Sequence, residues 1–201
     1  MHYNEYCGHI KPFQEEIIMK KAKVKLVPLT TEDREQFITD NQEAFNYGAL
    51  EEFGRRDGHF EEDGQIISRK VIEESIDAEG AETYRIVENG KNAGGMVLRI
   101  DPVTHRNELE LLFVSPKAHS KGIGYAAWLA AEALHPETEV WETCTPYFET
   151  RNIHFYVNKC GFHIVEFFNP LHPDPNDPDR PLSEGRGGIA EGMFRFEKRM
   201  K

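Results

Sequence analysis

The sequence predicts an α+β fold in three layers, in which about four helices flank a central sheet of six to seven strands. Two observations lead to this prediction. Segments of strand character alternate with segments of helical spacing in the order β-α-α-β-β-β-α-β-α-β-β. In addition, residues 122–134 place small side chains on one helix face, which favours close packing on a sheet. The expected strands are residues 23–30, 83–87, 95–100, 107–114, 139–143, 162–168 and 193–198.

The first half of the chain contains two of the expected helices and a hairpin. Residues 23–30 alternate like an edge strand, where Pro28 is tolerated. A helix should begin at Thr31, whose hydroxyl precedes two acidic residues, and end near Gly48. The sequence Asn89-Gly90 predicts the turn between two strands. A second helix is expected from apolar side chains close to 3.6-residue spacing, at Ile66, Ile67, Val71, Ile72 and Ile76.

The most informative segment, Val-Ser-Pro-Lys-Ala-His-Ser-Lys-Gly-Ile-Gly-Tyr-Ala, occupies residues 114–126, between a strand and a helix. Glycine lets an anion reach the main chain, and the N–H groups of a helix N-terminus attract phosphate. Two nucleotide-binding patterns fit it poorly. The P-loop pattern fails because Lys121 precedes Gly122. The dinucleotide pattern Gly-x-Gly-x-x-Ala, from Gly122 to Ala127, begins eight residues after Val114 instead of at the strand end.

The segment resembles the signature of the GNAT superfamily of N-acetyltransferases. The resemblance lies in Val114-Ser115-Pro116 and in His119-Ser120-Lys121-Gly122-Ile123-Gly124, where the family has Gln or Arg at the position of His119. A second segment, Asn-Ile-His-Phe-Tyr-Val-Asn-Lys-Cys-Gly-Phe at residues 152–162, is similar to the family's Asn…Phe-Tyr…Gly-Phe helix and the strand after it. The resemblance covers residues 108–168. It implies a mixed sheet that splays open beside strand 107–114, with acetyl-CoA as co-substrate and its pantetheine arm in the gap.

The resemblance also implies which residues bind acetyl-CoA. The main chain of Phe113 and Val114 would bind the pantetheine and polarise the thioester carbonyl. Asn152 could bond the pantetheine amides, and a helix-capping role is equally open. Main-chain N–H groups between His119 and Ala126 would hold the pyrophosphate, and Lys121 could add charge. The full set of loop and helix residues is His119, Ser120, Lys121, Gly122, Ile123, Gly124, Tyr125 and Ala126.

Three residues are candidates for catalysis. Tyr156 would be the general acid, because a phenol with a pKa of about 10 stays protonated at neutral pH. Its alternative role is a core tyrosine on an apolar helix face. Glu108 and Glu110 are candidate general bases, and Glu108 matches the family position six residues before the valine. Both share the parity of Leu112 and Val114, so they are expected on one side of the strand, and solvated glutamates are the alternative.

Charge and composition exclude several classes of protein. The formal net charge of −11 argues against a nucleic-acid binder and suits a cationic amine acceptor. No apolar run is long enough for a membrane helix, and the first residues do not form a secretory signal. Cys7, Cys144 and Cys160 have no metal-ligand spacing, which is consistent with reduced thiols in the cytoplasm. No metal site is expected, since the acidic stretch 172–179 is interrupted by prolines.

The expected organisation is an N-terminal extension at residues 1–22 and a single domain at residues 23–201, with a long loop at 169–192 before the last strand. The predicted function is transfer of an acetyl group from acetyl-CoA to a primary amine of a small molecule by direct attack. A covalent route through Cys144 or Cys160 lacks a positioned base. The alternative is a non-catalytic acyl-CoA-binding or regulatory protein on the same fold. The oligomeric state is open, and a homodimer is compatible with the sequence.

Overall fold

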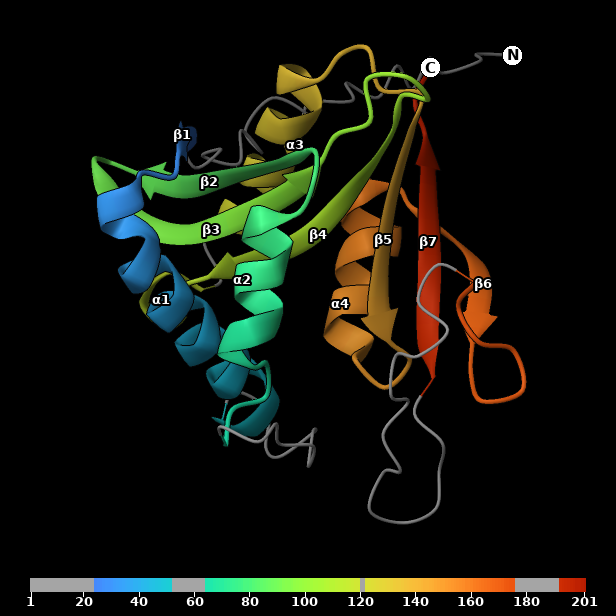
Figure 1. Cartoon of the computed structure of the whole chain (residues 1–201), viewed down its shortest axis with the longest axis horizontal. Coiled ribbons are helices and arrows are strands. Elements are labelled where there is room, and N and C mark those ends of the chain that lie inside the picture. The colour runs from blue at the N-terminus through green and yellow to red at the C-terminus, as the bar shows by residue number, and fades with distance from the viewer. Residues whose placement is uncertain (1–23, 52–63, 120–121, 176–191) are drawn as a thin grey trace, which may run out of the picture.

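The computed structural model describes residues 24–51, 64–119, 122–175 and 192–201. These residues form four α-helices and seven strands, which confirms the predicted fold class (Figure 1). The strands are β1 (Val24–Pro28), β2 (Ala81–Glu88), β3 (Lys91–Arg99), β4 (Arg106–Val114), β5 (Val140–Pro146), β6 (His163–Phe168) and β7 (Met193–Arg199). The α-helices are α1 (Arg34–Asn46), α2 (Arg69–Asp77), α3 (Ile123–Leu134) and α4 (Thr150–His154). Two 3-10 helices are η1 (Thr31–Asp33) and η3 (Pro116–Ala118), and two π-helices are η2 (Tyr47–Glu51) and η4 (Phe155–Cys160).

All seven strands belong to one mixed sheet in the order β1-β2-β3-β4-β5-β7-β6. Neighbouring strands are antiparallel except β4 and β5, which are parallel and joined through α3. Helices α1 and α2 pack on one face of the sheet, called the front face, against Leu111 and Phe113. Helices α3 and η4 pack on the opposite, back face, against Leu109, Trp141 and Phe196. The molecule therefore has the three layers that the element order predicts.

Strand β4 contains a β-bulge that reverses which side chains face each helical layer. Val97 of β3 lies opposite Leu111, whereas the next residue, Leu98, lies opposite Leu109, so Glu110 is the extra residue. Leu109 packs in the back core, and Leu111 packs in the front core. The prediction that Glu108 and Glu110 share a side with Leu112 and Val114 is therefore wrong. Both glutamates lie on the front face, while Leu112 and Val114 pack on the back core.

The sheet splits between β4 and β5. Their parallel pairing consists of Arg106 with Val140, Asn107 with Trp141 and Glu108 with Glu142. β4 continues to Val114 and β5 to Pro146 without further pairing, and Figure 1 shows the two strands diverging. We call this opening the fork. It confirms the splayed sheet that the resemblance implies, and among the described residues no strand pairs with the facing edges of β4 and β5 beyond Glu108 and Glu142.

Several element boundaries differ from the sequence prediction. Helix α2 begins at Arg69, because Ser68 accepts a hydrogen bond from the Val71 N–H at 3.2 Å and so caps the helix after Ile66 and Ile67. Strand β5 extends to Pro146 instead of ending at residue 143. On α3, which was expected to pack through small side chains, the large side chain of Trp128 is fully buried, and Leu134 at the end of the helix is exposed.

Parts of the expected organisation fall outside the described residues. These are the extension at residues 1–22 and most of the loop before β7. Over the described ranges, no helix has the length and apolar character needed to cross a membrane.

Candidate functional site

The segment after β4 folds back on the end of that strand. Ser115 donates its N–H to the Ala93 carbonyl at 2.8 Å, and the turn η3 follows at once. His119 Nε2 then donates to the Val114 carbonyl at 2.8 Å, which fixes the tautomer because a carbonyl only accepts. The His119 ring also packs edge-on against Tyr47 of η2, with 5.4 Å between ring centroids. The His119 side chain thus bonds to a carbonyl for which the resemblance implies pantetheine binding, and it uses one of the two lone pairs of that oxygen.

Within the part of the chain that the structure describes, the first amides of α3 have no hydrogen-bond acceptor, at the place where the sequence predicts a phosphate site. Gly122 is the N-cap residue at φ = 73°, the left-handed region that glycine adopts at no steric cost, and provides no side-chain cap. The first bond of the helix runs from the Ala126 N–H to the Gly122 carbonyl at 3.0 Å. The N–H groups of Ile123, Gly124 and Tyr125 precede this bond and have no acceptor within the helix. Together with the helix dipole, amides of this kind can bind an anion.

The space around this helix start is open enough for a ligand to approach the main chain. A Cβ atom built on Gly122 would meet no atom within 4 Å. One on Gly124 would lie 3.6 Å from Val114 Cγ2, in ordinary contact with the end of β4. The predicted binding residues Ser120 and Lys121 lie outside the described residues. The described part of the loop therefore fits a diphosphate held by main-chain amides.

Two glycines of β3, Gly94 and Gly95, let β3, β4 and α1 pack closely on the front side of β4. Phe113 is buried and contacts Phe37 of α1 edge-on, with 5.1 Å between ring centroids. A Cβ on Gly94 would lie 2.1 Å from the Phe113 carbonyl oxygen, so only glycine fits there. The Phe113 side chain is thus part of the core, as predicted, so a ligand could use only the main chain of this residue.

Tyr156 lies on the back side of the fork. It is buried, and its ring contacts Phe155, Phe162 and Phe196 at centroid distances of 5.5, 5.7 and 5.5 Å. Burial raises the pKa of Tyr156 to about 12, and a hydrogen bond with Thr143 acts in the opposite direction. Tyr156 is therefore both a core residue and a protonated phenol beside the point where β4 and β5 separate.

The helix that carries Tyr156 is wider than an α-helix. It changes from α4 into the π-helix η4 at Phe155, and the Gly161 N–H bonds to the Tyr156 carbonyl five residues earlier. Gly161 ends the helix at φ = 81°, the usual conformation of a glycine after a helix C-terminus. Single π-turns of this kind are often found at functional sites.

Asn152, the remaining predicted cofactor residue, is already engaged within the protein. Its Nδ2 donates to Thr145 Oγ1 at 3.3 Å, and Thr145 is buried on β5. Asn152 thereby ties the first turn of α4 to the edge of the fork. Its side-chain oxygen remains the group that could accept from a pantetheine amide.

The two candidate bases share one cationic partner. Arg99 of β3 approaches Glu110 at 3.0 Å and Glu108 at 3.8 Å. Glu110 also accepts from the buried Ser75 of α2 at 3.4 Å. Both carboxylates are partly exposed, at 33% for Glu108 and 24% for Glu110, so solvent and a bound amine can reach them. They lie on the front face at the base of the fork, next to α2.

Three residues of this site were not predicted from the sequence: Tyr47, Arg99 and Thr143. For Thr143 the sequence does contain a signal, because this residue lies two positions after the buried Trp141 on a strand, so both side chains point to the same side of the sheet. A polar residue at a core position of that kind needs a hydrogen-bond partner. Arg99 and Tyr47 depend on strand register and on the π-turn η2, which no local pattern specifies.

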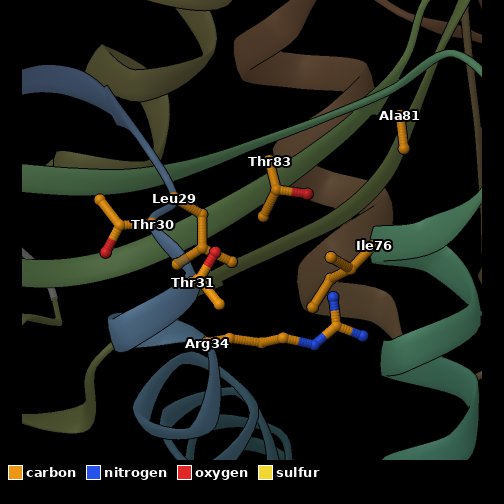
Figure 2. A pocket seen from close by; sticks show the side chains of 7 residues that line it. All are labelled: Leu29, Thr30, Thr31, Arg34, Ile76, Ala81 and Thr83. Atoms are coloured by element: carbon orange, nitrogen blue, oxygen red, sulfur yellow. The ribbon is translucent and has the colours of Figure 1, made fainter.

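Two other features lie apart from this chemistry. Burial raises the pKa of the Cys160 thiol to about 12, so it is not a nucleophile at neutral pH. A hollow of about 290 Å³ lies between β1, α1, α2 and β2, and Figure 2 shows Arg34 and Ile76 on its wall. Arg34 is held there by Asp77 at 2.6 and 2.7 Å. The hollow therefore belongs to the junction of the two front helices with β2 and not to the fork.

Sequence comparison supplies the identification. The model of the acetyltransferase (GNAT) family matches residues 35–162, which include β4, the turn between β4 and α3, and Tyr156. The chain belongs to the GNAT family. It is also 47% identical over 187 residues to an uncharacterized protein, YrkN of Bacillus subtilis (strain 168), and this match covers 90% of the present chain and 96% of YrkN.

Solved structures of GNAT proteins share the fold of this family member. The ribosomal-protein-S18-alanine N-acetyltransferase of Escherichia coli has a TM-score of 0.61 at 14% identity, with 89% of this chain and 94% of that chain covered. A spermidine N-acetyltransferase of Vibrio cholerae, in complex with CoA and spermine, has a TM-score of 0.60 at 14% identity over 88% and 95%. The PaiA N-acetyltransferase of Thermoplasma acidophilum, in complex with CoA, has a TM-score of 0.57 at 17% identity over 88% and 99%.

Proposed function

We propose that this GNAT protein transfers an acetyl group from acetyl-CoA to a primary amine of a small, cationic molecule by direct attack. The observation that carries the proposal is the fork together with the unpaired amides of Ile123, Gly124 and Tyr125 beyond it. An extended pantetheine chain needs main-chain partners, and a diphosphate needs converging N–H groups. Two CoA complexes among the structural relatives support the same co-substrate.

Acetyl-CoA supplies an acetyl group activated as a thioester. The amides at the start of α3 would hold its diphosphate, and the main chain of β4 would align the pantetheine beside Tyr156. Tyr156 would give its proton to the sulfur as the carbon–sulfur bond breaks. The resulting Tyr156 phenolate would then take up the proton that the amine nitrogen loses as the carbon–nitrogen bond forms. Before the attack, Glu108 or Glu110 would take the extra proton of the ammonium group, directly or through water, and release it to solvent, so that the attacking nitrogen is neutral.

The acceptor class is proposed from the charge and position of the candidate bases. Glu108 and Glu110 bring two carboxylates to one guanidinium at the front of the fork, and the chain as a whole has a formal charge of −11. Both favour an ammonium group over an anion. The spermidine N-acetyltransferase among the relatives supports an amine of this kind. A panel of spermidine, free amino acids and an alanine-terminated peptide, assayed by CoA release, tests the acceptor class.

The co-substrate site is tested by a matched pair of variants at Gly122. Asn and Asp both tolerate its left-handed conformation, both can cap the helix, and neither meets another atom at Cβ. They differ only in charge. We expect Gly122→Asp to weaken acetyl-CoA binding by at least tenfold relative to Gly122→Asn, measured by calorimetry, because a carboxylate repels the diphosphate. Equal affinities for the two variants would contradict the proposed phosphate site.

A further inference from the structure

The peptide unit between Val114 and Ser115, at the end of β4, is held at both of its polar groups. Ser115 donates its N–H to the Ala93 carbonyl at 2.8 Å, just before β4's partner strand β3 continues at Gly94. The Val114 carbonyl accepts from His119 Nε2, also at 2.8 Å. Because a peptide unit is planar, its N–H and C=O turn together, and bonds to both groups fix the plane. The two partners therefore set the direction of the Val114 carbonyl.

The turn η3 brings the His119 side chain back to the strand that precedes it. Pro116 occupies the first position of the turn, where its fixed φ is compatible with a helical start. The Ala118 N–H bonds to the Ser115 carbonyl at 2.8 Å and closes the turn. Tyr47 of η2 packs edge-on against the imidazole, with 5.4 Å between ring centroids. The turn and the tyrosine ring together restrict the rotation of the imidazole.

We propose that His119 is a positioning residue, which orients the Val114 carbonyl toward the pantetheine chain of acetyl-CoA. This inference rests on the proposed function, in which the main chain of β4 aligns that chain. A carbonyl oxygen has two lone pairs and accepts one hydrogen bond through each. His119 occupies one of them, so the remaining lone pair has a fixed direction. A pantetheine N–H could use it without reorganisation of the peptide, which lowers the cost of binding.

The same strand end also contacts the first turn of α3. A Cβ atom built on Gly124 would lie 3.6 Å from Val114 Cγ2 and 3.7 Å from the Phe155 ring. Val114 is thus held by His119 at its carbonyl and approached by α3 at its side chain. The peptide that would bind pantetheine and the amides that would bind the diphosphate therefore keep a defined relative position.

The binding test separates the two halves of the cofactor. His119→Leu removes the N–H donor, whereas His119→Gln keeps one at a similar reach. We expect His119→Leu to weaken acetyl-CoA binding about fivefold in calorimetry, the effect of one hydrogen bond, and His119→Gln to stay within about twofold of wild type. The nucleotide half of CoA, a phosphorylated ADP without pantetheine, should bind His119→Leu as it binds wild type. No loss in His119→Leu, an equal loss in His119→Gln, or an equal loss for the nucleotide half would overturn the inference.

The kinetic test uses a second histidine as the matched control. His172 follows the edge strand β6, and its Nε2 also bonds at 2.8 Å, to Glu166. His119→Leu should raise the KM for acetyl-CoA with kcat within about twofold of wild type, because a binding interaction is lost. His172→Leu should leave this KM unchanged. An equal rise in both variants, with thermal unfolding showing that both are folded, would contradict a specific role for His119.

A third measurement does not depend on turnover. A hydrogen-bonded imidazole N–H exchanges slowly, so the His119 Nε2 proton should be visible by NMR in the wild type and absent from His119→Gln. Tyr47→Leu should shift this signal because the neighbouring aromatic ring is lost, and Tyr47→Phe should not. A His119 ring protonated on Nδ1 alone would overturn the inference. If this signal and the binding results are as expected but no amine is acetylated, the positioning role is supported and the proposed transfer fails. A wild type that does not bind acetyl-CoA would overturn both.

Discussion

Tyr156 and Cys160 lie close together on one helix, and burial stabilises the neutral form of both side chains. The pKa of each is raised to about 12, from ordinary values of about 10 for the phenol and 9 for the thiol. Tyr156 therefore remains protonated across the neutral range and can donate a proton. Cys160 remains a thiol over the same range, which supports direct transfer to the amine without an acyl-cysteine.

Replacing Tyr156 by Phe should lower kcat by about a hundredfold, the lower end of the usual contribution of a general acid. Removing only the hydroxyl keeps the ring contacts, so the affinity for CoA should remain within about twofold of wild type. Steady-state kinetics and calorimetry measure the two effects. A fully active Tyr156→Phe enzyme would exclude this residue as the acid, whereas binding of CoA with no turnover in any variant would favour the non-catalytic alternative.

Stability should fall at alkaline pH because of the same two residues. Above about pH 9 to 10 the unfolded chain loses the thiol and phenol protons, while the folded protein keeps them until about pH 12. The unfolded state then binds fewer protons, so the free energy of unfolding decreases as the pH rises through this window. Urea denaturation at pH 8, 9.5 and 11 should show the decrease. Tyr156→Phe should show a smaller decrease than wild type between pH 9.5 and 11.

At the scale of the secondary-structure element, β3 approaches β4 closely at Gly94, which has no side chain. The Phe113 carbonyl occupies the space in which Gly94 would have a Cβ atom, at 2.1 Å. The Gly94→Ala substitution must therefore displace the end of β4, which we expect to cost about 2–3 kcal/mol of unfolding free energy. Gly90→Ala is the control: Gly90 has φ = 77° and an open surrounding, so only the left-handed strain of about 1 kcal/mol applies. Chemical denaturation of both variants tests the difference.

The elements also show which parts of the site a sequence can predict. The turn between the end of β4 and the start of α3 is predicted correctly because its features are local: a strand end, a proline, glycines and a helix start. The side of the sheet occupied by Glu108 and Glu110 was not, because the bulge at Glu110 has no glycine to mark it and reverses the alternation. The partners Arg99 and Thr143 come from neighbouring strands, and their positions depend on registers that no single segment specifies.

At the scale of the whole molecule, the sheet is two antiparallel units, β1–β4 and β5–β7–β6, joined by three parallel pairs. The back core spans both units, because Trp128 of α3 contacts Trp141 of β5 and Phe162, at centroid distances of 5.3 and 5.1 Å. The two halves are therefore held together mainly by α3 and η4 behind the sheet. A ligand that occupies the fork would add contacts to both halves.

Acetyl-CoA should therefore stabilise the folded protein. At a hundredfold excess over its dissociation constant the free energy of unfolding should rise by about 2.7 kcal/mol, observed as an increase in the thermal midpoint. NAD at the same concentration is the control for a dinucleotide site and should leave the midpoint unchanged. Hydrogen exchange should slow in β4 beyond Glu108 and at the start of α3. A shift with NAD and none with acetyl-CoA would contradict the assignment of the loop.

The fork has an evolutionary consequence. Every residue type except proline offers the same peptide N–H and C=O, so a substitution by any other residue in the arms of the fork or in the first turn of α3 leaves these groups in place wherever the backbone path is kept. Selection on recognition through peptide groups would therefore act on strand geometry and on a few glycines, and would leave most side chains free to drift. Solved relatives keep this architecture at 14–17% identity, as such freedom would allow.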